Sequence, residues 1–159
     1  MEFHPNSDFK EIAVDGIPIP EKDVVSVDHV ADGVSGLRIV MVNIFAVTHP
    51  DGGWTLVDAG LPYSTARIRA WVKEKFSNLG KPQGVVLTHG HFDHVGALRE
   101  LADEWNVPVY AHEQESPYLT GKEKYPRPDP SVGGGLMALM SPFYPRDSAN
   151  VSDRLETFR

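Results

Sequence analysis

The sequence predicts an α/β fold of the α+β sandwich type, in which helices flank a mixed β-sheet. Three observations lead to this prediction. Short apolar segments with the pattern of strands alternate with two segments whose apolar residues recur at helical spacing. Only a few residues connect one segment to the next, as in βαβ units. The chain has 159 residues, of which 41% are hydrophobic, so it can bury one core and we expect a single domain.

The first part of the chain has the patterns of strands. Residues 24–30 alternate in the way expected of a half-buried strand. Residues 37–47 are almost continuously apolar and rich in branched side chains, which predicts a strand buried on both faces. Turn-forming residues follow at 49–53, so residues 54–58 are expected to return as the antiparallel partner in a hairpin.

The next part alternates helices with strands. Ser64 or Thr65 can cap a helix over residues 65–79, and a second helix is expected over residues 94–105. Their apolar stripes are Ile68, Trp71, Val72, Phe76 and Leu79 in the first, and Val95, Leu98, Leu101 and Trp105 in the second. Residues 84–88 and 107–111 have the composition of short buried strands.

Residues 117–145 form a region rich in proline and glycine, with six prolines and the run Gly133-Gly134-Gly135 around a short apolar patch at 136–140. We expect a long loop with a helical turn or two. A long loop of this kind is either a binding loop or lid, or a plain connection, and the sequence leaves both readings open.

Composition excludes several classes of protein. The formal net charge of -7 disfavours nucleic acid and anionic membranes as partners held by bulk electrostatics. The absence of cysteine removes disulfides, thiolate metal sites and cysteine nucleophiles, and it fits a reducing, cytoplasmic location. The longest apolar stretch has 11 residues, so no membrane span is expected.

Four metal-binding side chains lie within six residues, in His89-Gly90-His91-Phe92-Asp93-His94. The strand before them ends at the edge where α/β sheets place ligands. His89 and His91 are two apart in an extended segment and can chelate one ion. Asp93 and His94 are expected to start the following helix and to point toward a second ion. Imidazole and carboxylate without thiolate favour Zn, with Fe or Mn as alternatives.

The segment 88–96 resembles the HxHxDH signature of the metallo-β-lactamase superfamily, whose hydrolases include glyoxalase II, lactonases and RNA-processing nucleases. Residues 56–60, Leu-Val-Asp-Ala-Gly, are similar to the VDxG strand end upstream of that signature. Residues 109–113 are similar to the strand that follows the metal helix. The resemblance covers about residues 24 to 116.

The resemblance implies a metal-dependent hydrolase with a small-molecule substrate. In the complete domain His89 and His91 would bind a first Zn ion, and Asp93 and His94 a second. A metal-bound hydroxide would attack an ester, thioester, lactone, amide or phosphodiester, and Asp93 would have a catalytic role in holding or accepting the hydroxide's proton. Asp58 would orient a ligand histidine through its other ring nitrogen.

The resemblance also implies that the family's αββα fold is represented here by its first half only. Residues 1–159 would form a single, apparently incomplete domain that lacks the second-half ligands and has little or no activity alone. We favour a piece of a longer hydrolase. The alternatives are a self-associating metal-binding half-domain and a scaffold without turnover. Because the inner face of the sheet would be bare, a homodimer or a complementary C-terminal fragment is expected to cover it.

Overall fold

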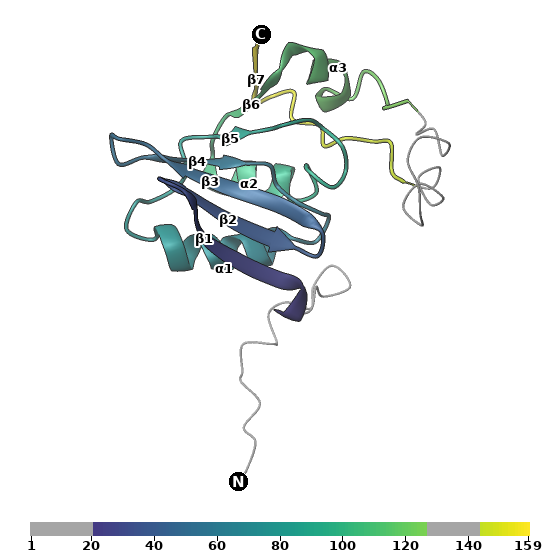
Figure 1. Ribbon diagram of the computed structural model, residues 1–159. Helices are drawn as coiled ribbons and strands as arrows, with labels where there is room; N and C mark the ends of the chain where they lie inside the picture. Colours follow the sequence, from purple (N-terminus) through teal and green to yellow (C-terminus); the bar gives the residue numbers. More distant parts are fainter. Residues whose placement is uncertain (1–20, 127–143) are drawn as a thin grey trace.

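The computed structural model of the protein describes residues 21–126 and 144–159. These residues form a seven-stranded sheet in the order β1-β2-β3-β4-β5-β6-β7, and Figure 1 shows helices α1 and α2 on one face of it. The prediction of a mixed sheet with flanking helices is confirmed. Among the described residues, no helix is long and apolar enough to cross a membrane.

The first four strands form an antiparallel meander. They are β1 (Val24–Ala31), β2 (Val34–Ile39), β3 (Val42–Thr48) and β4 (Trp54–Val57), preceded by the 3-10 helix η2 (Glu21–Asp23). The β3–β4 hairpin pairs Thr48 with Trp54 and turns where the sequence predicts. The last strand of the meander, β4, is the one that pairs with the parallel part of the sheet.

The prediction of a strand over residues 37–47 is wrong. Two strands occupy this segment, and Ile39 pairs with Val42 across a tight turn formed by Val40 and Met41. Val40 has a φ of 58°, and the two turn side chains are 44% and 60% exposed. Because tight hairpin turns are normally marked by glycine, asparagine or aspartate, two apolar turn residues leave the break invisible in the sequence.

The second part of the sheet is parallel. Strands β5 (Val85–Val86) and β6 (Val109–His112) follow α1 (Thr65–Phe76) and α2 (Leu98–Trp105), and β7 (Leu155–Phe158) adds the last strand beside β6. Helix α1 begins where the sequence predicts and ends three residues early, because the chain turns at Leu79 and Gly80. Strand β7 has no counterpart in the sequence prediction.

The second helix begins later than predicted, so Asp93 and His94 precede it instead of starting it. The reason lies in the backbone hydrogen bonds. The carbonyl of His94, which would accept a bond inside a helix, accepts from Ala59 N–H at 2.7 Å. Gly96 N–H donates to Gly60 at 2.7 Å. The loop after β4 therefore holds this segment in turns until Leu98.

Two short elements follow β6, namely the 3-10 helix η3 (Glu113–Glu115) and α3 (Ser116–Leu119). The expected Pro- and Gly-rich loop at 117–145 thus starts inside a helical turn. Its middle, including the apolar patch at 136–140, lies outside the described residues.

The core lies between the sheet and helices α1 and α2. Trp54 stacks on Phe76 with ring centroids 4.7 Å apart, and it meets Trp105 edge to face at 6.2 Å. Both predicted helical stripes face this core: their buried members are Ile68, Trp71, Val72, Phe76, Val95, Leu98 and Leu101, with Leu79 and Trp105 partly buried. The core fixes the positions of β4 and β5, whose ends carry the site described below.

The opposite face of the sheet carries apolar side chains without a covering layer in the part of the chain that the structure describes. Paired residues share a face, so the register places these side chains together. They are the half-buried Phe45, Val47, Val57 and Val86 and the exposed Val25, Val27 and Phe158. One side of the segment 37–47 is therefore buried, and the other carries half-buried Phe45 and Val47 beside exposed Arg38 and Asn43.

Candidate metal centre

The candidate site forms where β4 and β5 end side by side. Asp58 follows β4 and Thr88 follows β5 by two residues, and Val57 pairs with Val86 between the two parallel strands. Asp58 N–H donates to the Val86 carbonyl at 2.9 Å. The carboxyl ends of neighbouring parallel strands therefore bring Asp58 to the start of the histidine segment.

Asp58 is the anchor of the site. It is 3% exposed, with Oδ1 accepting from Thr88 N–H at 2.9 Å and Oδ2 accepting from the Thr88 hydroxyl at 2.7 Å. His94 Nδ1 lies 2.8 Å from Oδ2. Since a carboxylate can only accept, Nδ1 of His94 carries the proton. Nε2 of neutral His94 therefore keeps a free lone pair.

The same reasoning sets the tautomer of His89. The Thr88 hydroxyl gives its one hydrogen to Asp58, so it accepts from His89 Nδ1, which lies 3.1 Å away. His89 is thereby held with Nε2 as its available nitrogen. One buried carboxylate, directly and through one hydroxyl, orients two of the four candidate ligands.

The four candidate ligands lie together. The His89 ring centroid is 4.1 Å from that of His94 and 4.7 Å from that of His91. Asp93 Oδ2 is 3.7 Å from His94 Nε2. Because His89 is nearer to His94 than to His91, the two pairs expected from the spacing are not separated in space.

The surroundings of His89 and His94 shift the pKa values of these two histidines in opposite directions. Burial, and then the positive charges of His94 and His91, lower the pKa of His89 and favour its neutral form. The hydrogen bond to Asp58 raises the pKa of His94. A metal ion takes the neutral form of imidazole, so the lowered pKa of His89 favours the form that a ligand needs.

The donors fit a transition metal by type and by proximity. They are three imidazoles and a carboxylate, and two of the imidazoles have a fixed tautomer with Nε2 available. As the side chains stand, however, no three His, Asp or Glu residues within 21–126 and 144–159 are arranged so that they could hold an ion. The residues thus supply the donors, and their arrangement is not a finished coordination shell.

Two other histidines, His49 and His112, have hydrogen bonds outside this cluster. His49 sits in the β3–β4 turn, hydrogen-bonded to Gln83 and Thr55 at 3.1 and 3.0 Å. His112 caps η3 by accepting from Gln114 N–H at 3.2 Å. Both therefore have local structural contacts, as the sequence suggests for histidines outside a motif.

Sequence reasoning missed two residues that contact the histidine segment. Glu115 Oε2 and the Tyr125 hydroxyl each lie 2.9 Å from Gly90 N. They stand 25 and 35 residues beyond Gly90, and no spacing rule connects them to the motif. Thr88 was also missed as a contact of Asp58, although it directly precedes the first histidine.

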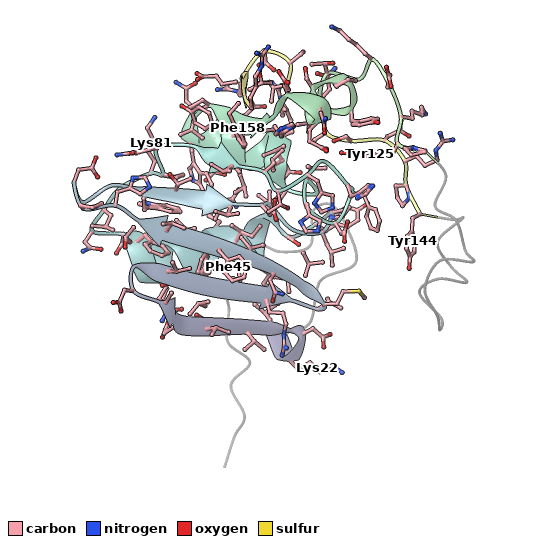
Figure 2. The ribbon with its side chains drawn as sticks, turned by 45° about the horizontal axis from the view of Figure 1, so that its top comes forward. Lys22, Phe45, Lys81, Tyr125, Tyr144 and Phe158 are labelled. Atoms are coloured by element: carbon pink, nitrogen blue, oxygen red, sulfur yellow. The ribbon has the colours of Figure 1, made fainter. Side chains whose placement is uncertain are left out.

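A small hollow of about 110 Å³ opens beside His91. Figure 2 shows two of the residues that line it, Tyr125 and Tyr144, on the same side of the molecule. Its walls are mostly aromatic or ring-shaped, with one cationic side chain: His91, Phe92, Tyr125, Pro126, Tyr144, Pro145 and Arg146. The site thus has room for a small group next to a candidate ligand.

Comparison with known proteins supports the resemblance. The probable metallo-hydrolase YflN of Bacillus subtilis (strain 168) is 41% identical over 128 residues, which cover 79% of this chain and 48% of that protein. The probable metallo-hydrolase YybB of the same strain is 32% identical over 88 residues, covering 55% of this chain and 38% of that protein. The chain therefore spans about half the length of these relatives, or less.

Solved structures share the fold. MEM-A1, a subclass B3 metallo-beta-lactamase from a soil metagenome library, superposes with a TM-score of 0.58 at 20% identity, covering 80% of this chain and 43% of that one. BJP-1, a subclass B3 metallo-beta-lactamase of Bradyrhizobium japonicum, gives 0.52 at 21% identity, covering 78% and 42%. Residues 37–159 match the metallo-beta-lactamase superfamily along the strands and loops that carry Asp58 and the histidine segment. The chain belongs to the metallo-beta-lactamase superfamily.

Proposed function

We propose that this chain supplies the metal-binding half of a metal-dependent hydrolase that acts on small molecules. The observation that carries the proposal is the contact of 2.8 Å between Asp58 Oδ2 and His94 Nδ1 inside a cluster of four ligand side chains. A buried carboxylate that fixes the tautomer of a histidine is typical of metal sites and has little purpose in an ordinary surface histidine.

The proposed ligands are His89, His91, Asp93 and His94. Imidazole and carboxylate donors without thiolate suit Zn, and Fe or Mn remain alternatives because availability often decides the metal. In the complete domain we expect two ions. When bound, the metal would polarise the scissile oxygen of the substrate and lower the pKa of a water molecule.

The chain's own residues have distinct tasks in this proposal. Asp58 and Thr88 keep Nε2 of His89 and His94 available. Asp93, whose Oδ2 lies 3.7 Å from His94 Nε2, would hold or accept a proton beside these nitrogens. The hollow beside His91 would receive part of the substrate.

The substrate class is proposed as an ester, thioester, lactone, amide or phosphodiester of a small molecule. Glyoxalase II-like thioester hydrolysis belongs to this range by family resemblance alone. The net charge of -7 disfavours a polyanionic nucleic acid. Since the chain spans 48% of YflN, we propose that the missing ligands belong to the remainder of a longer protein.

The test joins metal content to hydrolysis. Replacing His89 and His91 together with Ala should remove Zn from the purified protein, as measured by inductively coupled plasma mass spectrometry. The matched control is His49→Ala, which removes a histidine from the β3–β4 turn and should leave the metal content unchanged. Equal metal content in the double variant and the wild type would reject the proposed ligands.

A second candidate function is a self-associating metal-binding half-domain without turnover. The uncovered sheet face favours it, because Val25, Val27 and Phe158 are 37%, 43% and 46% exposed on that face. A second copy of this chain would cover the face by a twofold contact. Hydrolysis of a panel of thioesters and lactones by a metal-loaded longer chain, which carries the remainder of the domain, separates the two functions, since a scaffold shows no metal-dependent rate there either.

A further inference from the structure

The backbone of the histidine segment is held from outside at one point. Gly90 N–H, between His89 and His91, lies 2.9 Å from both Glu115 Oε2 and the Tyr125 hydroxyl. The Tyr125 hydroxyl in turn donates to the same Glu115 carboxylate. Glu115 therefore accepts two hydrogen bonds, and the three groups form one closed network around the Gly90 amide.

Tyr125 is itself held firmly. It is buried, and its backbone N–H donates to the Arg146 carbonyl at 3.2 Å while Arg146 Nε donates to the Tyr125 carbonyl at 2.6 Å. Burial, followed by the hydrogen bond to Glu115, raises the pKa of the Tyr125 hydroxyl well above its usual range. The hydroxyl is also fixed by its own hydrogen bonds, since it donates to Glu115 and accepts from Gly90 N–H.

The same tyrosine contacts a candidate ligand directly. Its ring centroid is 4.1 Å from that of His91. On another side the ring stacks with that of Tyr118, with the centroids 4.0 Å apart and an interplanar angle of 17°. His91 is exposed and, unlike His89 and His94, it has no hydrogen bond to Asp58 or Thr88 within the part of the chain that the structure describes. The Tyr125 ring is thus the neighbour best placed to limit where His91 points.

The close packing at Gly90 explains why no side chain fits there. A Cβ atom at this position would lie 2.8 Å from the Tyr125 hydroxyl and 3.1 Å from Leu119 Cδ2. The glycine lets the backbone approach Glu115 and Tyr125 closely enough for both hydrogen bonds. The contact is therefore made by the backbone itself, between the two histidines.

We propose that Glu115 and Tyr125 are positioning residues for the metal centre: they fix the Gly90 amide and the His91 ring, so that His89 and His91 face the same ion. The proposal rests on the proposed function, because it takes His89 and His91 as ligands. In this proposal Asp58 orients His94 and, through Thr88, His89, while Glu115 and Tyr125 hold the backbone at Gly90.

The test uses the full chain with Tyr125→Phe, Glu115→Ala and Glu115→Gln. Tyr125→Phe keeps the ring against His91 and removes only the hydroxyl, while Glu115→Gln keeps an acceptor for the Gly90 amide. The matched control is Tyr118→Phe, which removes a hydroxyl from the neighbouring ring. Two quantities are measured: Zn²⁺ affinity by competition with a chromophoric chelator, and hydrogen exchange of the Gly90 amide in EDTA-treated protein.

We expect Tyr125→Phe and Glu115→Ala to weaken Zn²⁺ binding by about 10- to 100-fold, the usual effect of losing a residue that orients a ligand. Exchange of the Gly90 amide should rise by about tenfold in Glu115→Ala, relative to the Leu87 amide in the sheet, for the loss of one charge-assisted hydrogen bond. The rise should be smaller in Tyr125→Phe, where the amide loses only a neutral acceptor. Glu115→Gln should recover part of both effects, and Tyr118→Phe should change neither.

Faster exchange at Gly90 with unchanged Zn²⁺ affinity would overturn the proposal, because the contact would then be structural only. Unchanged exchange in both Tyr125→Phe and Glu115→Ala would overturn it as well. If the wild-type chain binds no Zn²⁺, the proposed function fails. The positioning role toward the metal then falls with it, whereas wild-type Zn²⁺ binding that neither Tyr125→Phe nor Glu115→Ala weakens overturns the positioning role alone.

Discussion

Asp58→Asn is the substitution that tests the metal centre most directly. It keeps the shape of a side chain that is 3% exposed and accepts from Thr88 N–H, the Thr88 hydroxyl and His94 Nδ1. An amide has one acceptor oxygen and one donor nitrogen, so it cannot accept all three bonds. If the oxygen faces His94, the amide nitrogen faces the Thr88 N–H; if the nitrogen faces His94, the proton of His94 must move to Nε2.

The magnitude follows from this geometry. Leaving one buried donor without a partner costs about 1–3 kcal/mol in the free energy of unfolding. The second arrangement also puts a proton on the nitrogen that would bind the metal, so Zn²⁺ affinity should fall by about 10- to 100-fold. We therefore expect a moderate loss of stability and a large loss of metal binding.

Two assays separate these effects. Urea unfolding of EDTA-treated protein gives the stability, and competition with a chromophoric chelator gives the Zn²⁺ affinity. Asp51→Asn is the matched control, because Asp51 is an exposed aspartate that accepts from Gly53 N–H in the β3–β4 turn. Wild-type Zn²⁺ affinity in Asp58→Asn, or an equal loss in Asp51→Asn, would refute the reasoning.

Three further predictions concern activity, association and strain. A longer chain that carries the remainder of the domain should hydrolyse thioesters or lactones far faster than these 159 residues alone, and equal metal-dependent rates would show that this half suffices. Sedimentation at micromolar concentration should show a homodimer, with mass spectrometry excluding a retained second polypeptide; a compact monomer would contradict the inference from the bare sheet face. Val40→Gly should raise the free energy of unfolding by about 1 kcal/mol, because Val40 has a φ of 58° that glycine adopts without strain. Met41→Gly, at the next turn position, should not stabilise the protein, and a gain there would argue against strain at Val40.

The elements that the sequence predicted well are those in which the spacing of apolar residues matches the face that is buried. Helix α1 is an example, because Ile68, Trp71 and Phe76 recur at helical spacing and all three are buried against the sheet. The β3–β4 hairpin is another, since its turn carries the glycine and proline that mark such turns. In both, the local pattern and the tertiary contact agree.

The failures have a common physical cause, which is that a contact distant in sequence decided the local structure. Helix α2 begins only at Leu98 because backbone groups of residues 94–97 form hydrogen bonds with Ala59 and Gly60 instead of with one another. The break at Val40 is enforced by the pairing of β2 with β3, not by the turn residues themselves. Strand β7 depends on pairing with β6 after a gap of more than forty residues.

The site shows the same contrast between what the local sequence predicts and what distant contacts decide. The spacing of His89, His91, Asp93 and His94 indicates which side chains are donors, but their usable atoms depend on groups elsewhere. Asp58 reaches His94 across the neighbouring strand and reaches His89 through Thr88, while Glu115 holds the backbone between the first two histidines. Each of these contacts orients a ligand side chain or the backbone that carries it. The motif therefore determines which atoms can donate to a metal, and the fold determines where those atoms point. A short peptide with the same six residues should therefore bind Zn²⁺ far more weakly than the folded chain, even though it carries every proposed ligand.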